Sequence, residues 1–394
     1  MQSKQYKVQA LMPKYEVDAI LVSSPENFHY VTGMASHQLT VSRNPGVAAA
    51  VMAADPAIPM HVIGMDFEVR AFEEKMDFII KQYDTWVGTK SWHEVVANEN
   101  SQNAKSFRSF AGSLLVIVDT LTETGFANKR IGLELDFLPL GYYRLLTEQL
   151  PEATFINISP LFIEARSVKT LEEISLFRNI TRVADEALSF ASTYIKEGVS
   201  EQELIDHYRE KVMASRICVP SAWSGFLSGP NGGRLSLPTD RRITSGDIIK
   251  FDGGVNCEFD FYTTDMSRAW IFGEADKRIM TLKDKLYQAQ RLAISQIKPG
   301  VPMREIYFAA FNCVRKYLHC YERGHTGHSI SLGPSTTEEP VISASNTRLL
   351  EPGMILCVEV PFYIREVGGF NIEDMVLVTD TGYEVLTYRT PHYL

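Results

Sequence analysis

Aspartates inside an apolar β-hairpin are the feature that most constrains how this chain folds. The stretch 250–270, KFDGGVNCEFDFYTTDMSRAW, has the aromatic and apolar spacing of two paired strands, yet it contains Asp252, Asp260 and Asp265. If its halves pair around a short turn at residues 258–259, Asp252 lies directly opposite Asp265, with Cβ atoms about 5 Å apart. Asp260 falls on the other face near the turn, where we expect a solvated side chain.

Two carboxylates at that distance repel each other, and burying them unpaired is costly. A divalent cation, or a pair of them, removes the conflict. Other apolar strands of the same half of the chain contain matching donors: Glu359 in GMILCVEVPFY, Glu373 in GGFNIEDMVLV and His328 in RGHTGHSISLG. We expect a turn at residues 368–369 to pair the strands of the two glutamates.

These donors together favour a metal site, although each alone is more often a structural polar group. Four carboxylates and one imidazole make a hard, oxygen-rich set that suits Mn, Fe, Co or Zn rather than a cysteine-type zinc site. Two metals with bridging carboxylates lie about 3.5–4 Å apart and deprotonate a shared water. His325 either faces this pocket or lies at the surface, and Arg268 is expected to pack behind the ligands.

The length of 394 residues predicts two domains. We place them at residues 1–160 and 161–394. The first alternates short strands with helices, which predicts an α/β sheet. The strands of this domain are expected at residues 18–23, 46–52, 60–63, 113–119 and 129–135. Its helices are expected at residues 67–75, 91–97 and 138–149.

The second part predicts an α+β fold, with long paired helices and strands arranged as hairpins. A helix begins after Thr170, whose capping-box partner is Glu173, and continues to about residue 195. Further helices are expected at 200–215, 280–297 and 303–317, and the hairpins at 248–272 and 354–379.

Composition excludes several classes of protein. The net charge of −9 argues against a nucleic-acid-binding face. The five cysteines are odd in number and lie outside CxxC spacing, so we expect reduced thiols of a cytoplasmic protein rather than a disulfide framework. No apolar run approaches the roughly 18 residues of a membrane span, and we expect no membrane partner.

At this point the sequence resembles the pita-bread metallopeptidases (family M24), which include methionine aminopeptidase, aminopeptidase P, prolidase and creatinase. The N-terminal stretch VDAILVSSPENFHYVTG is similar to the start of the creatinase/prolidase N-terminal domain. The catalytic domain of the family is matched, in order, by ARSVKTLEEISLFRNITRVADEAL, SGDIIKFDGG, YTTDMSRAWIFG, IKPGVPMREI, TGHSISLG, LEPGMILCVEVPFY and NIEDMVLVTDTGYEVLT.

The resemblance implies an α/β N-terminal domain, an α+β pita-bread catalytic domain, two divalent metal ions and a homodimer. It implies five metal ligands, with Asp265 and Glu373 bridging and Glu359 also moving protons: Asp252, Asp265, His328, Glu359 and Glu373. His328 and Glu359 are thereby candidate catalytic residues. His325 is also a candidate catalytic residue, because it could substitute for one of two family histidines that this chain lacks.

Two departures concern the substrate. Family peptidases carry one histidine where this chain has Leu235 and a second where it has Thr337. Such histidines hold the scissile carbonyl, and losing donors of that kind costs a few kcal/mol each in the transition state.

The resemblance therefore implies a dinuclear-metal-dependent hydrolase of the aminopeptidase P/prolidase type. It would cleave a C–N bond of an Xaa-Pro peptide or related small substrate through a metal-bridging hydroxide. The alternative is a non-peptidase acting on a small molecule, similar to dimethylsulfoniopropionate lyase or creatinase; the short spacing from Glu359 to Glu373 favours the lyase group. An inactive binding scaffold is the least favoured reading, because no ligand is missing.

Overall fold

The computed structural model describes residues 4–73, 78–86, 88, 90–97, 111–257, 260–333 and 335–394. The chain divides into two compact units between Ala165 and Arg166, inside helix α8 (Ser159–Ser167). From the sequence we place this division at residue 160. Each unit has its own sheet and hydrophobic core.

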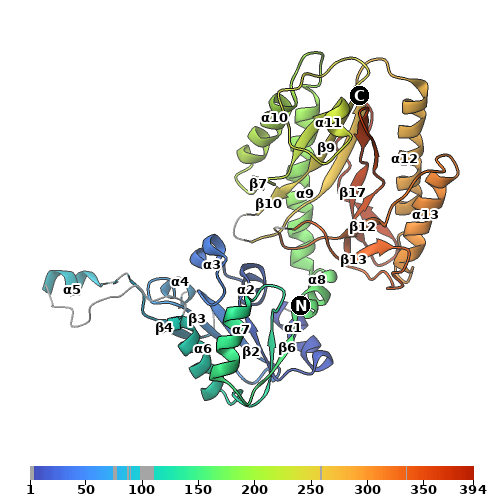
Figure 1. The fold of residues 1–394 in the computed structure, drawn as a ribbon. Helices are drawn as coiled ribbons and strands as arrows, with labels where there is room; N and C mark the ends of the chain where they lie inside the picture. The colour runs from blue at the N-terminus through green and yellow to red at the C-terminus, as the bar shows by residue number, and fades with distance from the viewer. Residues whose placement is uncertain are drawn as a thin grey trace. The chain divides into compact units, whose positions relative to one another are not determined.

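The N-terminal unit is an α/β domain around a six-stranded mixed sheet in the order β4-β3-β2-β1-β5-β6 (Figure 1). β1 pairs parallel with β5 and antiparallel with β2. The strands are β1 (Ala19–Val22), β2 (Ala49–Ala53), β3 (His61–Met65), β4 (Ile79–Tyr83), β5 (Arg130–Leu133) and β6 (Thr154–Asn157). The sequence did not indicate β4 and β6. They form the two edges of the sheet, where burial is incomplete and the apolar pattern is weak.

The strand expected at 113–119 is wrong, because these residues lie in helix α6 (Ala111–Glu123). Its buried residues Leu114, Ile117 and Leu121 recur at helical spacing and join the core of the sheet. The unbroken apolar run SLLVIV concealed that stripe, since a short run of this kind fits either structure.

Three of the other helices of this unit, α4, α5 and α7, lie near the positions expected from the sequence. The first four helices, α1, η1, α2 and α3, were not predicted. The helix expected at 67–75 is the shorter α4, with residues 74 and 75 outside the described part of the chain. The helices are α1 (Lys4–Leu11), the 3₁₀ helix η1 (Met12–Tyr15), α2 (Pro25–Thr32), α3 (His37–Ser42), α4 (Arg70–Glu73), α5 (Trp92–Ala97) and α7 (Leu140–Gln149).

The C-terminal unit is an α+β domain around an antiparallel sheet in the order β13-β12-β14-β17-β11-β9-β8, with β18 beside β17. Two short ladders, β7–β10 and β15–β16, lie outside it. The strands are β7 (Val219–Pro220), β8 (Gly225–Ser228), β9 (Ile248–Gly253), β10 (Val255–Asn256), β11 (Met266–Ile271), β12 (His325–Ser329), β13 (Glu338–Ser343), β14 (Ile355–Glu359), β15 (Phe362–Ile364), β16 (Gly368–Phe370), β17 (Glu373–Val378) and β18 (Tyr383–Val385).

Helices pack in pairs in this unit, as the sequence indicated: α9 against α10 and α12 against α13 (Figure 1). The capping box of Thr170 and Glu173 is confirmed at the start of α9, and Ser200 with Glu203 forms a second one before α10. The helices are α9 (Leu171–Ser192), α10 (Glu201–Ala214), α11 (Gly229–Gly232), α12 (Lys277–Ser295) and α13 (Met303–Arg315).

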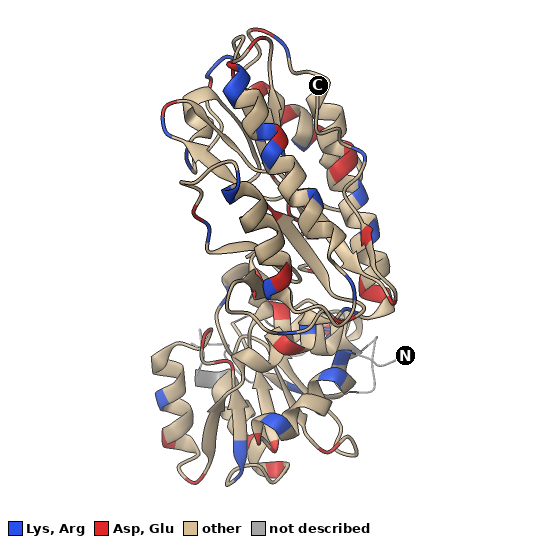
Figure 2. Ribbon diagram, turned by 90° about the vertical axis from the view of Figure 1, so that its right-hand side faces the viewer, with Lys and Arg blue, Asp and Glu red and all other residues tan. Residues whose placement is uncertain are grey.

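Acidic and basic residues are interleaved along the helices of the C-terminal unit in the view of Figure 2. Within the described parts of the chain, no helix combines the length and apolar character needed to cross a membrane.

Candidate metal centre

The hairpin β9–β11 carries two of the expected ligands, but its register differs from the prediction. Asp252 lies opposite Ser267, so the expected pairing with Asp265 is wrong by two residues. The ladder continues past β9 to an Asn256–Thr263 bridge, which moves the turn further along the chain. The turn expected at residues 258–259 lies outside the described residues. Because side chains alternate with a period of two, a two-residue shift leaves both carboxylates on the same face.

Two glycines allow strands of this region to approach closely. A Cβ at Gly254 would lie 1.9 Å from the carbonyl oxygen of Thr264, and one at Gly327 would lie 2.0 Å from that of Cys357. Gly327 also has φ +142°, which side-chain-bearing residues rarely adopt. It lies at an irregularity in β12 and brings the next residue, His328, directly opposite Cys357 on β14.

β14 and β17 place Glu359 directly opposite Glu373. The expected turn at residues 368–369 is wrong: both glycines lie in β16, which pairs with β15 around a turn at residues 365–367. Alternation along β17 sends Glu373 to the face of the site and the adjacent Asp374 to the opposite face, against α12.

The imidazole of His328 meets two of these carboxylates. Its Nε2 lies 3.8 Å from Asp265 Oδ2 and 3.8 Å from Glu373 Oε1. Its Nδ1 lies 3.0 Å from the carbonyl oxygen of Ser329. Because a carbonyl oxygen only accepts hydrogen bonds, the proton of the ring is on Nδ1. Burial lowers the pKa of His328, so the ring is neutral near pH 7 and its Nε2 lone pair faces the carboxylates.

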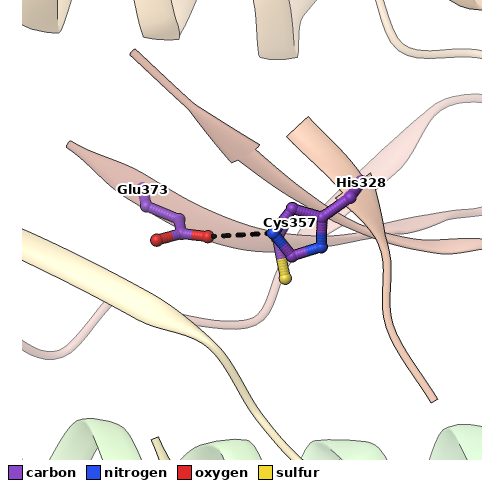
Figure 3. Close-up of side chains that lie close together, drawn as sticks. All are labelled: His328, Cys357 and Glu373. Carbon is purple, nitrogen blue, oxygen red and sulfur yellow. Dashed lines mark ion pairs between the residues drawn. The ribbon is translucent and has the colours of Figure 1, made fainter. Parts of the chain in front are cut away.

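Two groups of side chains have the mutual spacing of metal ligands. One contains Asp252, Asp265 and Glu373, and the other contains His328, Cys357 and Glu373, so that Glu373 is shared. Figure 3 shows the second group, with the ring of His328 next to the thiol of Cys357 and facing Glu373. Among the described residues, Asp265 Oδ1 and Glu373 Oε1 are buried without a hydrogen-bond partner. Buried carboxylate oxygens without donors are suited to a cation.

Crowding and burial raise the proton affinity of the cluster. Burial, followed by the charge of Asp252, holds the pKa of Asp265 well above its usual range. Burial and the charge of Asp265 do the same to the pKa of Glu373. Burial raises the pKa of Asp252 to about 6, although Lys250 opposes that rise. Without a cation, these groups retain protons that free carboxyls release.

Three cationic or amide side chains that the sequence analysis missed contact the carboxylates. Lys250 Nζ is 4.0 Å from Asp252 Oδ2, and its pKa is lowered by burial. Asn371 Nδ2 lies 3.5 Å from Asp252 Oδ2 and 3.4 Å from Glu373 Oε2. Arg323 Nη2 donates to Glu359 Oε1 at 2.5 Å.

A simple signal identifies most of the missed residues. Lys250, Asn371 and Cys357 each stand two residues before a predicted ligand, and the strand period puts such neighbours on one face. Arg323 carries no comparable signal, because it precedes β12 and reaches Glu359 only through the tertiary fold.

His325 faces the site rather than only solvent, since its Nδ1 is 3.4 Å from Glu359 Oε1. Leu235 and Thr337 are exposed, Leu235 to 84%. Asp260 is exposed beside the turn, as expected.

Arg268 packs behind the ligands, as expected. It is fully buried, donates from Nη1 to the carbonyl oxygen of Glu373 at 2.7 Å and pairs with Asp374 at 2.8 Å. Gln290 and Arg291 of α12 also donate to Asp374. This network fixes the backbone from which Glu373 projects.

The comparisons with known proteins agree with this architecture. Residues 175–380 match metallopeptidase family M24, and residues 4–168 match the creatinase/prolidase N-terminal domain. An uncharacterized peptidase of Staphylococcus aureus (strain bovine RF122 / ET3-1) is 30% identical over 285 residues, 71% of this chain and 80% of the relative.

Solved structures share the fold over the whole chain. The Xaa-Pro dipeptidase from Bacillus anthracis superposes with a TM-score of 0.81 at 22% identity, covering 99% of both chains. The prolidase from Pyrococcus horikoshii OT3 has a TM-score of 0.78 at 21% identity and 98% coverage of both. The expected α/β N-terminal domain and α+β pita-bread domain are thus confirmed, and the chain belongs to metallopeptidase family M24.

Proposed function

We propose that this protein is a dinuclear-metal-dependent hydrolase of the aminopeptidase P/prolidase type. It cleaves a C–N bond of an Xaa-Pro peptide or a related small substrate. The observation that carries the proposal is the cluster of half-buried Asp252 with buried Asp265 and Glu373, in which two oxygens lack donors and the Nε2 of His328 completes the set.

The residues present fit two divalent ions of the Mn, Fe, Co or Zn type. Five residues would hold them: Asp252, Asp265, His328, Glu359 and Glu373. Such ions polarise a substrate carbonyl and lower the pKa of water at the site. The thiol of Cys357 adds a softer donor to the group of His328 and Glu373, which favours Fe, Co or Zn over Mn.

The chain's own residues supply proton transfer and orientation. Glu359 accepts the proton of the attacking water and returns it to the leaving nitrogen. Arg323 and His325 both contact its Oε1 and hold the carboxylate in place. Lys250 and Arg323 bring positive charge to the cluster, which suits a substrate that ends in a carboxylate, as a dipeptide does.

A second candidate is a small-molecule enzyme of the family, similar to dimethylsulfoniopropionate lyase or creatinase. It is favoured by Leu235 and Thr337, because these exposed side chains offer no imidazole where the resembling peptidases have histidines. An inactive scaffold is least favoured, because none of the five proposed ligand residues is missing from the sequence.

The experiment is elemental analysis of the purified protein followed by a substrate panel. The panel contains Gly-Pro and Ala-Pro, creatine-like amides and dimethylsulfoniopropionate. We expect two equivalents of metal and cleavage of an Xaa-Pro bond. Turnover of dimethylsulfoniopropionate or an amide alone would establish the second candidate, and a metal-free, inactive protein would contradict both.

The proposal extends to a cytoplasmic homodimer acting on a short peptide or small molecule. All five cysteines are free thiols, which is typical of a reducing compartment. Light scattering coupled to gel filtration tests the dimer, since a mass near 44.4 kDa would identify a monomer.

A further inference from the structure

Two cysteines outside the metal centre lie directly opposite each other. In the ladder of β7 and β10, Val255 pairs with Pro220 and Asn256 with Val219, so the next pair in register is Cys257 and Cys218. Their Sγ atoms are 3.7 Å apart. Both residues are only 5% exposed and both are free thiols.

The hydrogen bonding of the ladder shows that the two cysteines form a non-hydrogen-bonded cross-strand pair, the kind in which the Cα atoms lie closer together. Ser221 N donates to the carbonyl oxygen of Gly254, which makes these two residues a hydrogen-bonded pair. Hydrogen-bonded and non-hydrogen-bonded pairs alternate along an antiparallel ladder, so the cysteines, three pairs further on, form a non-hydrogen-bonded pair. Cα atoms in such pairs are about 4.5 Å apart, within the range that a disulfide spans.

A pocket gives small molecules access to the two thiols. It has a volume of about 310 Å³ and is lined by Met213, Arg216, Ile217, Cys218, Val219, Cys257 and Asp260. Arg216 and Asp260 are exposed and Ile217 is 43% exposed, so the pocket opens to solvent.

The two thiols are not equivalent. The hydrogen bond between them lowers the pKa of Cys218 and raises that of Cys257. Either sulfur can donate in this contact, and the lowered pKa of Cys218 favours its thiolate as the first to attack.

We propose that Cys218 and Cys257 form a reversible disulfide by exchange with a low-molecular-weight disulfide such as oxidised glutathione. The Cys218 thiolate attacks one sulfur of the small disulfide, forms a mixed disulfide and releases one small thiolate. Cys257 then loses its proton, attacks the sulfur of Cys218 and releases the second small thiolate. Two electrons pass from the cysteines to the small disulfide, and the two cysteine protons pass to the released thiolates.

The experiment uses the full chain, incubated with oxidised glutathione, quenched in acid, alkylated and mapped by mass spectrometry. We expect a peptide linking Cys218 to Cys257, so that these two of the five thiols in the sequence are no longer alkylated, and we expect glutathione on Cys320. Dithiothreitol restores all five. Cys320 is exposed and serves as an internal control for the oxidant. A chain in which Cys320 is modified while Cys218 and Cys257 both remain alkylatable would overturn the proposal.

Single variants test the order of attack. Cys257→Ser retains a hydroxyl donor beside Cys218, and we expect it to accumulate a glutathione adduct at Cys218. Cys218→Ser is expected to leave Cys257 unmodified. The reverse pattern would overturn the assigned order. Equal unfolding midpoints under reducing conditions show that both variants are folded, and Cys→Ala versions replace any serine variant that is not.

Discussion

Lys250 and Asn371 show how single residues change the ionisation of a cluster of carboxylates. Lys250 and Asn371 contact Asp252, and Asn371 also contacts Glu373. An ammonium or amide at this distance stabilises the ionised carboxylate, whereas burial opposes ionisation. Burial prevails, because the pKa values of Asp252, Asp265 and Glu373 remain raised. The cluster is therefore suited to exchange protons for metal ions.

His328→Ala tests the metal centre at the scale of one residue. We expect loss of bound metal and of activity together, because Nε2 is the only imidazole donor that meets both Asp265 and Glu373 among the described residues. His325→Ala is the matched control: it contacts Glu359 from the edge, so metal should remain bound while turnover falls. Elemental analysis of both variants is the measurement. Full metal content in His328→Ala would contradict the ligand assignment.

The pH dependence of the metal-free protein follows from the raised pKa of Asp252. Its folded pKa of about 6 exceeds the ordinary 3.8, so between these values the folded state binds the extra proton. The free energy of unfolding should therefore fall by about 2–3 kcal/mol as pH rises from 4 to 6.

The contribution of Asp252 is isolated by comparing urea unfolding of the wild type and Asp252→Asn, both with chelator, across this pH range. The variant should lack this part of the slope. With saturating metal the trend reverses, because the ligands bind metal deprotonated. Identical slopes for the two metal-free proteins would disprove this account.

At the scale of elements, strand period and helix capping give reliable predictions, while registers and turns do not. The capping box of α9 follows from four residues of sequence, since its hydrogen bonds are local. The register of β9 and β11 depends on how many residues the connection uses and on the close approach at Gly254, which local pattern does not reveal. Parity survives a two-residue error, so the shared face of Asp252 and Asp265 was predictable although their pairing was not.

Thr170→Ala should destabilise the C-terminal unit by about 1 kcal/mol, because the amide of Glu173 loses its cap. Thr193→Ala at the other end of α9 is the control: Thr193 is exposed and its hydroxyl donates to the carbonyl of Phe190 in the same turn, so its cost should be within about 0.5 kcal/mol of zero. Urea unfolding followed by circular dichroism measures both. Equal effects would show that the cap contributes nothing specific.

At the scale of the whole molecule, all five proposed ligands belong to the unit of residues 166–394. Asp252 and Asp265 flank one hairpin, while His328, Glu359 and Glu373 come from strands about 60 to 120 residues further along. The sheet order β12-β14-β17-β11-β9 brings them together. The N-terminal unit has a separate core and contributes none of these ligands.

Removal of metal should therefore loosen one unit selectively. A ligand that binds only the folded state stabilises the unit that contains its site. With chelator, we expect faster amide hydrogen exchange in β9, β11, β14 and β17, with β1, β2 and β5 unchanged as the internal control. Hydrogen-exchange mass spectrometry on metal-loaded and chelated protein measures this. Equal acceleration in both sheets would contradict a metal site confined to the C-terminal unit.

The sequence by itself determined the α/β and α+β composition of the two parts, the long capped helices and the choice of candidate ligands. These depend on local hydrogen bonds, on periodicity and on the cost of placing a carboxylate in an apolar strand. Only the tertiary structure decided the register of Asp252 against Ser267, the helix at 111–123 and the approach of Arg323 to Glu359. Each of these depends on contacts between segments distant in sequence, whose energies local patterns do not contain.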